Sequence, residues 1–432
     1  MKIGVYGLWH LGTVTSACLA AKGFDVVGID DDAAVISNLN QGMAPIFEPG
    51  LEALLKAGLG STLSFTSDLS KISEARIVWV AFDTPVDDND RADTPYVIGR
   101  IEALLPHLAA DTVVLISSQL PVGSTAALQK KCDADFSGKN IRMAYSPENL
   151  RLGKAIEVFQ HPGRIIIGVK DEAAKTLLLP LMEPLCDQLI WTGVASAEML
   201  KHALNAFLAT SVTFINEIAT ICELVDADAS QVEQGLRSEP RVGQKAYVKP
   251  GGAFAGGTLA RDVRFLCDIA GNHGLRLPLL ESILPSNQEH QQWIRRKIHY
   301  YYNDLSGKII ALLGLAYKPG TDTLRRSWSI ELAQWLKAKG ASVKAYDPNI
   351  SSLPDSLQEY ITLTHSAETA YRDADALIIA NEHPSFRDIR PETIVHGMRR
   401  PLVVDQNRFL ASTLGAHDGL TFVSVGMRHD IQ

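Results

Sequence analysis

The chain has 432 residues, of which 46% are hydrophobic and 21% charged, and its 41 basic and 49 acidic side chains give a net charge of −8. This composition is ordinary for a globular protein and excludes a disordered, fibrous or disulfide-stapled chain. The length exceeds what one hydrophobic core serves, so two or three domains are expected. The acidic balance offers no general attraction to nucleic acid.

The cysteines indicate a reducing compartment. There are five, widely spaced and without a CxxC pair, namely Cys18, Cys132, Cys186, Cys222 and Cys267. Such spacing is typical of free thiols in a cytoplasmic protein and argues against a structural metal site. No run approaches the roughly 20 apolar residues of a membrane span, and the start of the chain does not resemble a signal peptide. We therefore expect a cytoplasmic protein with no membrane partner.

The N-terminal part alternates between strand and helix patterns. An apolar run over Lys2–Tyr6 ends at Gly7, a helix pattern covers residues 12–22, and a second strand over 24–29 ends at Asp30. Further strand-like runs follow at 77–82, 112–117, 142–145 and 165–169. This alternation predicts an α/β fold with a doubly wound parallel sheet.

The middle of the chain reads as helical. Residues 196–224 contain no glycine or proline and keep apolar residues at helical spacing, so they form the longest helix candidate. A long apolar helix between two α/β units either buries against both or forms a dimer interface, and we favour a homodimer through this helix.

A second α/β pattern begins near residue 308. A strand at 308–313 ends at Gly314, a helix covers 329–339, and a strand at 343–346 leads to Asp347, with later strands at 376–380 and 401–404. The chain thus repeats strand, glycine, helix, strand and aspartate at both ends. The predicted domains are 1–195, a dinucleotide-binding unit; 196–303, a central helical unit; and 304–432, a second Rossmann-like unit.

The first glycine turn has the outline of a dinucleotide fingerprint. In GLWHLG, Gly7 and Gly12 hold the first and third glycine positions of GxGxxG, and Trp9 occupies the second. The amide groups at the start of the helix (Trp9, His10, Leu11) suit an anion. Asp30 lies about 20 residues on, where a carboxylate accepts ribose hydroxyls. The alternative is a turn without ligand, since Trp9 either narrows the phosphate site or displaces the loop.

Polar residues further along suggest a catalytic site. Glu148 follows a strand and suits a general base or a carboxylate that holds a water. The alternative is an acidic side chain in a loop that only contacts solvent. Lys201 and Asn205 share one helix face. A half-buried lysine there could stabilise an oxyanion, and the alternative is an ordinary surface lysine. Thr258 and Asp262 end a glycine-rich loop, whose glycines allow close approach to a ligand, and are its functional candidates. The alternative is a flexible turn without a ligand.

A basic cluster follows the strand at 308–313. The cluster consists of Lys318, Arg325 and Arg326 in GLAYKPGTDTLRRS, and it suits the binding of a phosphate. The alternative is a basic surface that contacts only solvent.

Together and in this order, the segments resemble the UDP-glucose/GDP-mannose dehydrogenase family. The matching segments are GLWHLG, FEPGL at 47–51, Thr84 with Pro85, SQLPVGST at 118–125, SPENLRLG, AEMLKHALNAFLAT, PRVG at 240–243, the glycine loop, GLAYKPGTDTLRRS and AYDP at 345–348. The resemblance implies an enzyme that uses NAD to oxidise the C6 alcohol of a nucleotide sugar, with the sugar nucleotide bound by the C-terminal domain. It also implies a role in supplying precursors of polysaccharides.

The resemblance further assigns residues to roles. Glu148 would hold water, Lys201 and Asn205 would stabilise oxyanions, and Asp262 would assist the water. The NAD contacts would come from the first glycine turn with Asp30, and from Thr84, Ser118, Gln119 and Arg325. The sugar nucleotide would be contacted by Arg241, Tyr247, Lys249, Lys318 and Arg408.

The departures from the family pattern concern the chemistry. Family members carry a cysteine in the glycine loop, and Thr258 stands in that place here. A thiolate forms near neutral pH, whereas a threonine hydroxyl needs a dedicated base, so a thioester intermediate is not expected. Gln119 replaces a usual threonine, Asp83 precedes Thr84, and Asn407 stands where an arginine is usual.

Two classes of function follow. One is an NAD-dependent oxidoreductase that hydrates the aldehyde and oxidises the hydrate, stops at the aldehyde, or runs a redox-neutral cycle. The other is a descendant of the family that binds a nucleotide sugar, or a partner subunit, without turnover.

Overall fold

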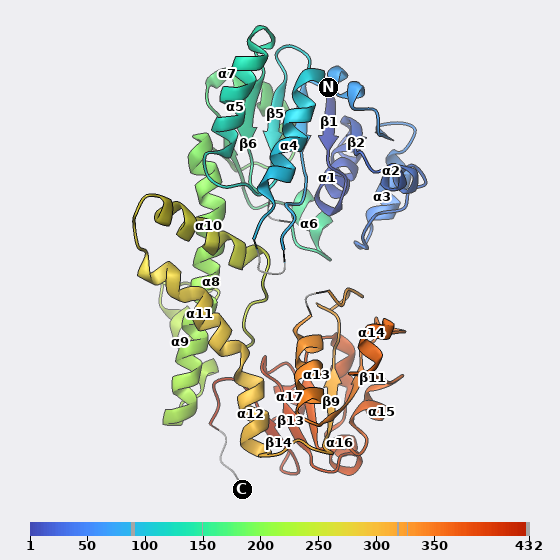
Figure 1. Ribbon diagram of the computed structural model, residues 1–432, viewed down its shortest axis with the longest axis vertical. Coiled ribbons are helices and arrows are strands. Elements are labelled where there is room, and N and C mark those ends of the chain that lie inside the picture. Colours follow the sequence, from blue (N-terminus) through green and yellow to red (C-terminus); the bar gives the residue numbers. More distant parts are fainter. Residues whose placement is uncertain (88–90, 149, 318, 326, 429–432) are drawn as a thin grey trace. The chain divides into compact units, whose positions relative to one another are not determined.

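The computed structural model describes residues 1–87, 91–148, 150–317, 319–325 and 327–428. By its internal contacts the chain divides into two compact units, Met1–Leu204 and Asn205–Gln432. The boundary lies inside helix α8 (Val194–Val225), which is drawn in green in Figure 1. Each unit contains one β-sheet and is described by itself below.

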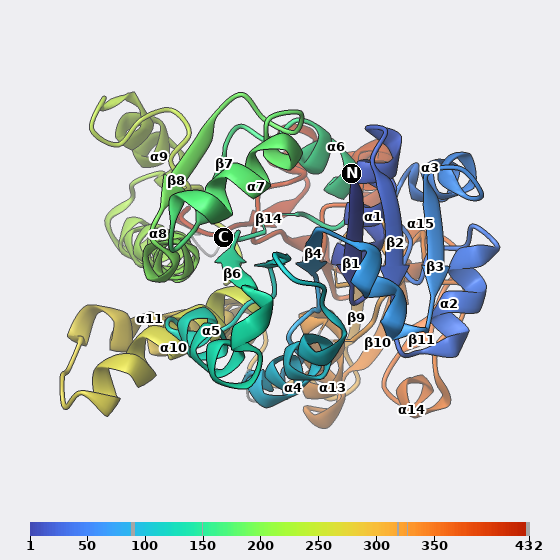
Figure 2. The same ribbon diagram turned by 90° about the horizontal axis from the view of Figure 1, so that it is seen from above.

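Among the described residues of the first unit, eight strands form one sheet in the order β3-β2-β1-β4-β5-β6-β7-β8. Neighbouring strands are parallel except for β6 and β7, which pair antiparallel. Figure 2 shows β3, β2, β1 and β4 following one another across the sheet. The strands are β1 (Lys2–Tyr6), β2 (Asp25–Ile29), β3 (Leu63–Thr66), β4 (Ile77–Val80), β5 (Val113–Ile116), β6 (Arg142–Tyr145), β7 (Ile165–Gly168) and β8 (Leu189–Thr192).

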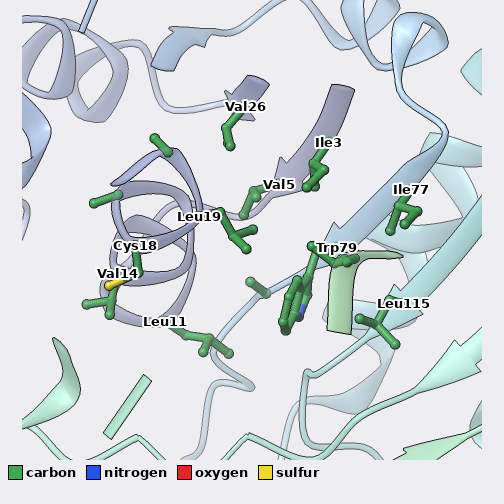
Figure 3. Packing of buried hydrophobic residues seen from close by; sticks show 14 of the residues in the cluster. Ile3, Val5, Leu11, Val14, Cys18, Leu19, Val26, Ile77, Trp79 and Leu115 are labelled. Atoms are coloured by element: carbon green, nitrogen blue, oxygen red, sulfur yellow. The ribbon is translucent and has the colours of Figure 1, made fainter. Parts of the chain in front are cut away.

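Helices cover this sheet and supply its core. They are α1 (His10–Ala21), α2 (Ala33–Asn40), α3 (Leu51–Gly58), α4 (Thr94–Leu104), α5 (Ser124–Asp135), α6 (Ala155–Gln160) and α7 (Glu172–Met182). Leu11 and Leu19 extend from α1 toward the strands that carry Val5 and Trp79 (Figure 3). Each fully buried side chain of this kind contributes about 1.5–3 kcal/mol relative to an exposed one. This packing fixes the β1–α1 turn, on which the first site depends.

The second unit repeats the arrangement around its own central strand. Its described strands lie in the order β11-β10-β9-β12-β13-β14, and all pairs are parallel. Their bounds are β9 (Ile309–Leu313), β10 (Ser342–Tyr346), β11 (Thr362–Leu363), β12 (Ala376–Ile379), β13 (Leu402–Val404) and β14 (Thr421–Val423). The prediction of two doubly wound α/β domains with a helical segment between them is confirmed.

The repeated glycine and aspartate have matching roles in the two sheets. The amide of Gly7 donates to Ile29 O at 2.9 Å, and that of Gly314 donates to Tyr346 O at 2.8 Å. Asp347 accepts the amides of Leu315 and Ala316 at 2.7 and 2.9 Å, so its carboxylate closes the second glycine turn.

Nine further helices of the described residues belong to the second unit. They are α9 (Ala229–Ser238), α10 (Thr258–Asn272), α11 (Pro278–Gln291), α12 (Trp293–Tyr301), α13 (Trp328–Ala338), α14 (Asp355–Gln358), α15 (Ala367–Tyr371), α16 (Pro391–Gly397) and α17 (Ala411–Leu414). Helices α8, α10 and α11 share a small core of Ala206, Ala209, Val263 and Ile283. That core positions the start of α10.

Helix α8 is long and mostly apolar. By length and composition it could cross a membrane, with a mean hydropathy of 1.4 over a window that is 33% buried. Core helices of soluble proteins have the same properties, and the absence of a membrane partner stays a prediction. The exposed part of α8 includes Phe207, Phe214 and Ile221, spaced seven residues apart.

Candidate functional site

The β1–α1 turn closes as tightly as a dinucleotide site requires. Gly7 has φ +94°, and a Cβ atom on Gly12 would lie 1.7 Å from the Gly7 carbonyl oxygen. No side chain caps the start of α1, where Trp9 occupies the N-cap position with 49% of its surface exposed. The helix N-terminus is therefore open to an anion. Trp9 has not displaced the loop.

Asp30 lies at the end of β2 and faces this turn. One carboxylate oxygen accepts the amide of Leu8 at 2.7 Å, and the other accepts the amide of Asp32 at 3.0 Å. The carboxylate is half-buried and keeps free lone pairs for ribose hydroxyls, since each oxygen has two acceptor positions.

Further predicted cofactor residues follow the carboxyl ends of β4 and β5. The Thr84 hydroxyl donates to Gln119 O at 2.6 Å, which ties the two segments together. Ser118 is buried, and its hydroxyl has no hydrogen-bond partner within the described part of the chain. A buried polar group without a partner is costly, so this edge of the sheet suits a polar ligand.

Glu148 and Lys201 meet in the first unit. Lys201 Nζ lies 3.6 Å from Glu148 Oε1 and also donates to the Glu148 carbonyl oxygen. The second carboxylate oxygen, Oε2, accepts the amide of Leu150 at 2.8 Å. Lys201 is buried, whereas the Glu148 side chain keeps 28% of its surface exposed. An ammonium group held in this way can stabilise negative charge on a nearby oxygen.

Buried carboxylates hold the surrounding loops. Glu198, on α8, accepts the amides of Gly123 and Thr125 at 2.7 and 2.9 Å, and so caps the start of α5. Glu48 accepts the amides of Gly153 and Ala155 at 2.8 Å and lies 2.9 Å from His10 Nε2. Helix α8 and the segment after α2 thus fix the loops after β5 and β6.

Asn205 and Asp262 meet in the second unit. Asn205 Nδ2 donates to Asp262 Oδ2, and both side chains are buried. Thr258 is exposed at the first position of α10, four residues before Asp262, and is therefore one turn away on the same face. Asp262 and Thr258 are brought together by this helix.

The cysteine on α10 is distant from Thr258. Cys267 lies on α10 itself, nine residues after Thr258 and hence about two and a half turns away on the opposite face. Burial raises the pKa of the thiols of Cys132, Cys222 and Cys267, and it raises that of Cys18 to about 12. These four thiols are therefore protonated near neutral pH and are poor nucleophiles.

Amide side chains clamp the glycine loop that precedes Thr258. Asn216 Oδ1 accepts the Gly251 amide at 3.0 Å, and Asn407 Oδ1 accepts the Gly252 amide at 2.7 Å. Asn287 exchanges two hydrogen bonds with the backbone of Phe254, at 3.0 and 2.9 Å. The side chain of Asn407 is therefore bound to this loop.

Arg408 and Lys249 have acidic partners. Arg408 makes two hydrogen bonds to Asp228, and although burial raises the pKa of that carboxyl, the bonds from Arg408 and Ser230 bring it below its ordinary value. Lys249 Nζ lies 3.9 Å from Glu382.

The other residues predicted to contact ligands are exposed or lie outside the described residues. Arg241 pairs with Glu239 at 2.8 Å, with 88% of its side chain exposed. Tyr247 and Arg325 are exposed as well. Lys318 and Arg326 lie outside the described residues.

Comparison with known proteins decides the family. Residues 1–186, 195–289 and 311–412 match the NAD binding, central and UDP binding domains of the UDP-glucose/GDP-mannose dehydrogenase family. The UDP-glucose 6-dehydrogenase of Rhizobium meliloti (strain 1021) is 34% identical over 99% of both chains. The chain belongs to the UDP-glucose/GDP-mannose dehydrogenase family.

Other members of this family agree in sequence and in fold. The UDP-glucose 6-dehydrogenase YwqF of Bacillus subtilis (strain 168) is 33% identical over 99% of this chain and 98% of its own. The structure of a UDP-glucose dehydrogenase from Pyrobaculum islandicum has a TM-score of 0.85 at 27% identity, covering 95% of this chain and 96% of that one. The UDP-D-ManNAc dehydrogenase of Pyrococcus horikoshii also gives 0.85, at 26% identity over 99% of both chains.

Family membership makes the chain an NAD-dependent dehydrogenase. The residues of the first unit fit NAD, because the tight turn at Gly7 and Gly12, the uncapped start of α1 and the partnerless Ser118 hydroxyl offer what a dinucleotide needs. The matched UDP binding domain supports a nucleotide sugar as substrate.

Sequence reasoning missed Glu48 and Glu198 as site-supporting residues. Glu198 is a charged residue on the apolar helix α8, three residues before Lys201 and thus on the same face, and this spacing was a usable signal. Glu48 lies in the FEPGL segment, but nothing local indicates that its partners are more than 100 residues away.

Proposed function

We propose that this dehydrogenase oxidises the C6 alcohol of a UDP-sugar with NAD and passes through no cysteine thioester. Thr258, exposed at the start of α10 beside Asp262, carries the proposal. A UDP-sugar is favoured because the relatives are UDP-glucose 6-dehydrogenases and the C-terminal part matches a UDP binding domain. A nucleotide uronic acid, the four-electron product, is a precursor of acidic polysaccharides.

Lys201 is proposed to hold the oxygen atoms that become negatively charged. NAD supplies the acceptor for the hydride from C6. As the alcohol proton leaves, the Lys201 side chain is proposed to stabilise the alkoxide, and Glu148 Oε1, 3.6 Å from Lys201 Nζ, holds it in place. In this proposal Asn205 contributes a second donor on the next turn of α8.

The second oxidation is proposed to proceed through a hydrate. Water adds to the aldehyde to give a gem-diol, whose carbon then yields a second hydride to NAD and leaves a carboxylate. The first oxidation releases one hydride to NAD and one proton, and the second releases one hydride to NAD and two protons, since its carboxylic acid product ionises; the protons pass to solvent or a base. Glu148 and Asp262 are the carboxylates proposed to orient the water and take its proton. The Thr258 hydroxyl is proposed to donate a hydrogen bond to the hydrate.

Counting reduced NAD per sugar tests this route. The purified protein is incubated with NAD and a panel of UDP- and GDP-sugars, with and without iodoacetamide, and absorbance of NADH is followed. Two NADH per sugar, unaffected by alkylation, is the expected result. One NADH per sugar would identify an enzyme that stops at the aldehyde. If no net NADH forms but hydrogen isotope exchanges at the sugar, the protein is a redox-neutral enzyme. If the sugar nucleotide binds in calorimetry without NADH formation or isotope exchange, the protein is a binding protein.

Variants assign the chemistry to residues. Lys201→Ala is expected to lower kcat at least about 100-fold while leaving binding of the sugar nucleotide within a few-fold, because the lost interaction acts on developing charge. Normal turnover in that variant would remove Lys201 from the mechanism. Thr258→Cys should make turnover sensitive to iodoacetamide. Cys267→Ser is its matched control on the same helix and should change nothing.

We also propose a homodimer in which α8 contacts a second copy. Phe207, Phe214 and Ile221 are 67, 48 and 54% exposed, and their seven-residue spacing is that of a helix seam. Phe207→Ser should convert the dimer to a monomer in light scattering after size exclusion. Leu279→Ser is the matched control, because Leu279 is 66% exposed on α11. A wild-type monomer would contradict the proposal.

The cytoplasm is the compartment proposed for this enzyme, because its five cysteines are unpaired and suit a reducing environment. Cell fractionation with an antibody to the chain would test it.

A further inference from the structure

A hollow of about 590 Å³ lies between α12 and α13 of the second unit, and none of the residues assigned above to NAD, substrate or catalysis lines it. The two helices are the gold and orange helices beside the second sheet in Figure 1. Their contact is direct, since the rings of His299 and Trp335 are 5.3 Å apart at 88°. The hollow is shallow and opens widely to solvent, so a ligand there would be held by the side chains that line it.

The lining is cationic although the chain carries a net charge of −8. Arg295, Arg296 and Lys339 contribute three positive charges, and no carboxylate lines the hollow. Within the described part of the chain, Arg295 and Lys339 have no ion pair. Arg296 pairs with Glu289 at 2.6 Å at the exposed rim. Solvent screens an exposed pair of this kind, so a phosphate can displace it.

The hydrogen-bonding groups of the hollow are mostly donors. Gln292 provides the only side-chain carbonyl among its lining residues, and that oxygen already accepts Arg295 Nη1 at 3.0 Å. A ligand rich in hydroxyl groups would need acceptors, whereas a ligand rich in acceptors finds guanidinium and ammonium groups. This chemistry favours phosphate over neutral sugar.

Aromatic side chains form the remaining wall. Trp335 lies under the Arg295 guanidinium, 5.5 Å from ring centroid to Cζ, and this contact holds the arginine over the hollow. Tyr300 also lines it and is 50% exposed. An exposed ring beside phosphate-binding cations is suited to stacking a nucleobase.

We propose that the hollow between α12 and α13 is a second nucleotide site, which binds the phosphates of a nucleoside polyphosphate through Arg295, Arg296 and Lys339 and its base against Tyr300. Binding there is separate from the oxidation chemistry and does not depend on which sugar the enzyme oxidises.

Calorimetry with ATP, adenosine and inorganic tripolyphosphate tests the site on the full chain. ATP should bind more tightly than either fragment, since both halves of the site are then used. Lys339→Glu should weaken ATP binding at least about tenfold, as expected for a lost charge-assisted contact. Lys337→Glu is the matched control: Lys337 lies in the last turn of α13, two residues before Lys339, is exposed, carries the same charge and does not line the hollow. Arg296→Gln provides a second, exposed position where folding is not at risk.

Equal weakening by Lys339→Glu and Lys337→Glu would overturn the proposal, because the nucleotide would then respond only to net charge. Absence of ATP binding at millimolar concentration would overturn it as well. Tripolyphosphate binding as tight as ATP, or unchanged ATP binding in Tyr300→Ala, would overturn the role given to the aromatic wall. Because the readout is binding, failure here is distinguishable from failure of the proposed oxidation, which is measured as NADH.

Discussion

Replacing Asp405 by asparagine should remove a pH-dependent loss of stability. Asp405 follows β13 and is fully buried, and its Oδ2 accepts the Leu410 amide at 2.7 Å. Burial raises the pKa of this carboxyl from 3.8 to about 6, against the lowering effect of backbone amides, with a smaller rise from the charge of Glu382. The folded protein therefore resists ionisation of this group.

The size of the effect follows from the two pKa values. A tenfold change in acidity is worth about 1.36 kcal/mol, so a rise from 3.8 to about 6 corresponds to about 3 kcal/mol. Because the folded-state pKa is the higher one, the stability contributed by the protonated group is complete below pH 3.8 and is lost as pH rises through about 6. The amide of Asp405→Asn keeps the acceptor for Leu410 and never ionises.

Urea unfolding of both proteins at a series of pH values between 4 and 7.5 measures the difference. The free energy of unfolding of Asp405→Asn, relative to wild type, should increase by up to about 3 kcal/mol across this range and level off near neutrality. Asp418→Asn, at an exposed position in the same domain, removes the same charge and should show no such trend. A pH-independent difference between Asp405→Asn and wild type would refute the reasoning.

Three further substitutions test the supports of the site. Gly12→Ala would place Cβ 1.7 Å from the Gly7 carbonyl oxygen, so the turn must open, and NAD affinity by calorimetry should fall at least about tenfold while the chain stays folded. Glu198→Gln replaces a fully buried carboxylate that caps α5 and should cost about 1.5–3 kcal/mol, seen as a lower melting temperature; an unchanged value would contradict the capping role. Asn407→Ala leaves the Gly252 amide without its acceptor, and should lower kcat more than it raises KM if the glycine loop positions reacting groups.

Much of the fold was predictable because it depends on local periodicity. The strand at Lys2–Tyr6 and the helix now seen as α8 were expected to within about two residues, since buried parallel strands and long helices leave strong apolar patterns. Strands β3 and β8 were missed, because their short segments have exposed or half-buried positions that weaken the pattern. The antiparallel pairing of β6 and β7 was also not predictable, since strand direction is set by the path of the chain between them.

The candidate site was predictable in its residues more than in its contacts. The i, i+4 spacing of Lys201 and Asn205 indicated one shared face of a helix, and the structure has both on α8. Sequence gave no sign that Arg408 would pair with Asp228, which is 180 residues away. An arginine after a strand suggests a ligand contact from its charge alone, but its partner depends on which helix the fold brings next to it.

The sequence by itself determined the order of most elements, the two glycine turns and the hydroxyl side chain at residue 258, because these are properties of residue type and of spacings within one or two turns of chain. Only the tertiary structure decided that Glu48 and Glu198 hold distant loops and that Asn407 clamps the glycine loop. It alone placed three cations around a hollow between α12 and α13. Such contacts join residues from about 75 to 155 positions apart or from separate helices, and packing, not local pattern, selects them.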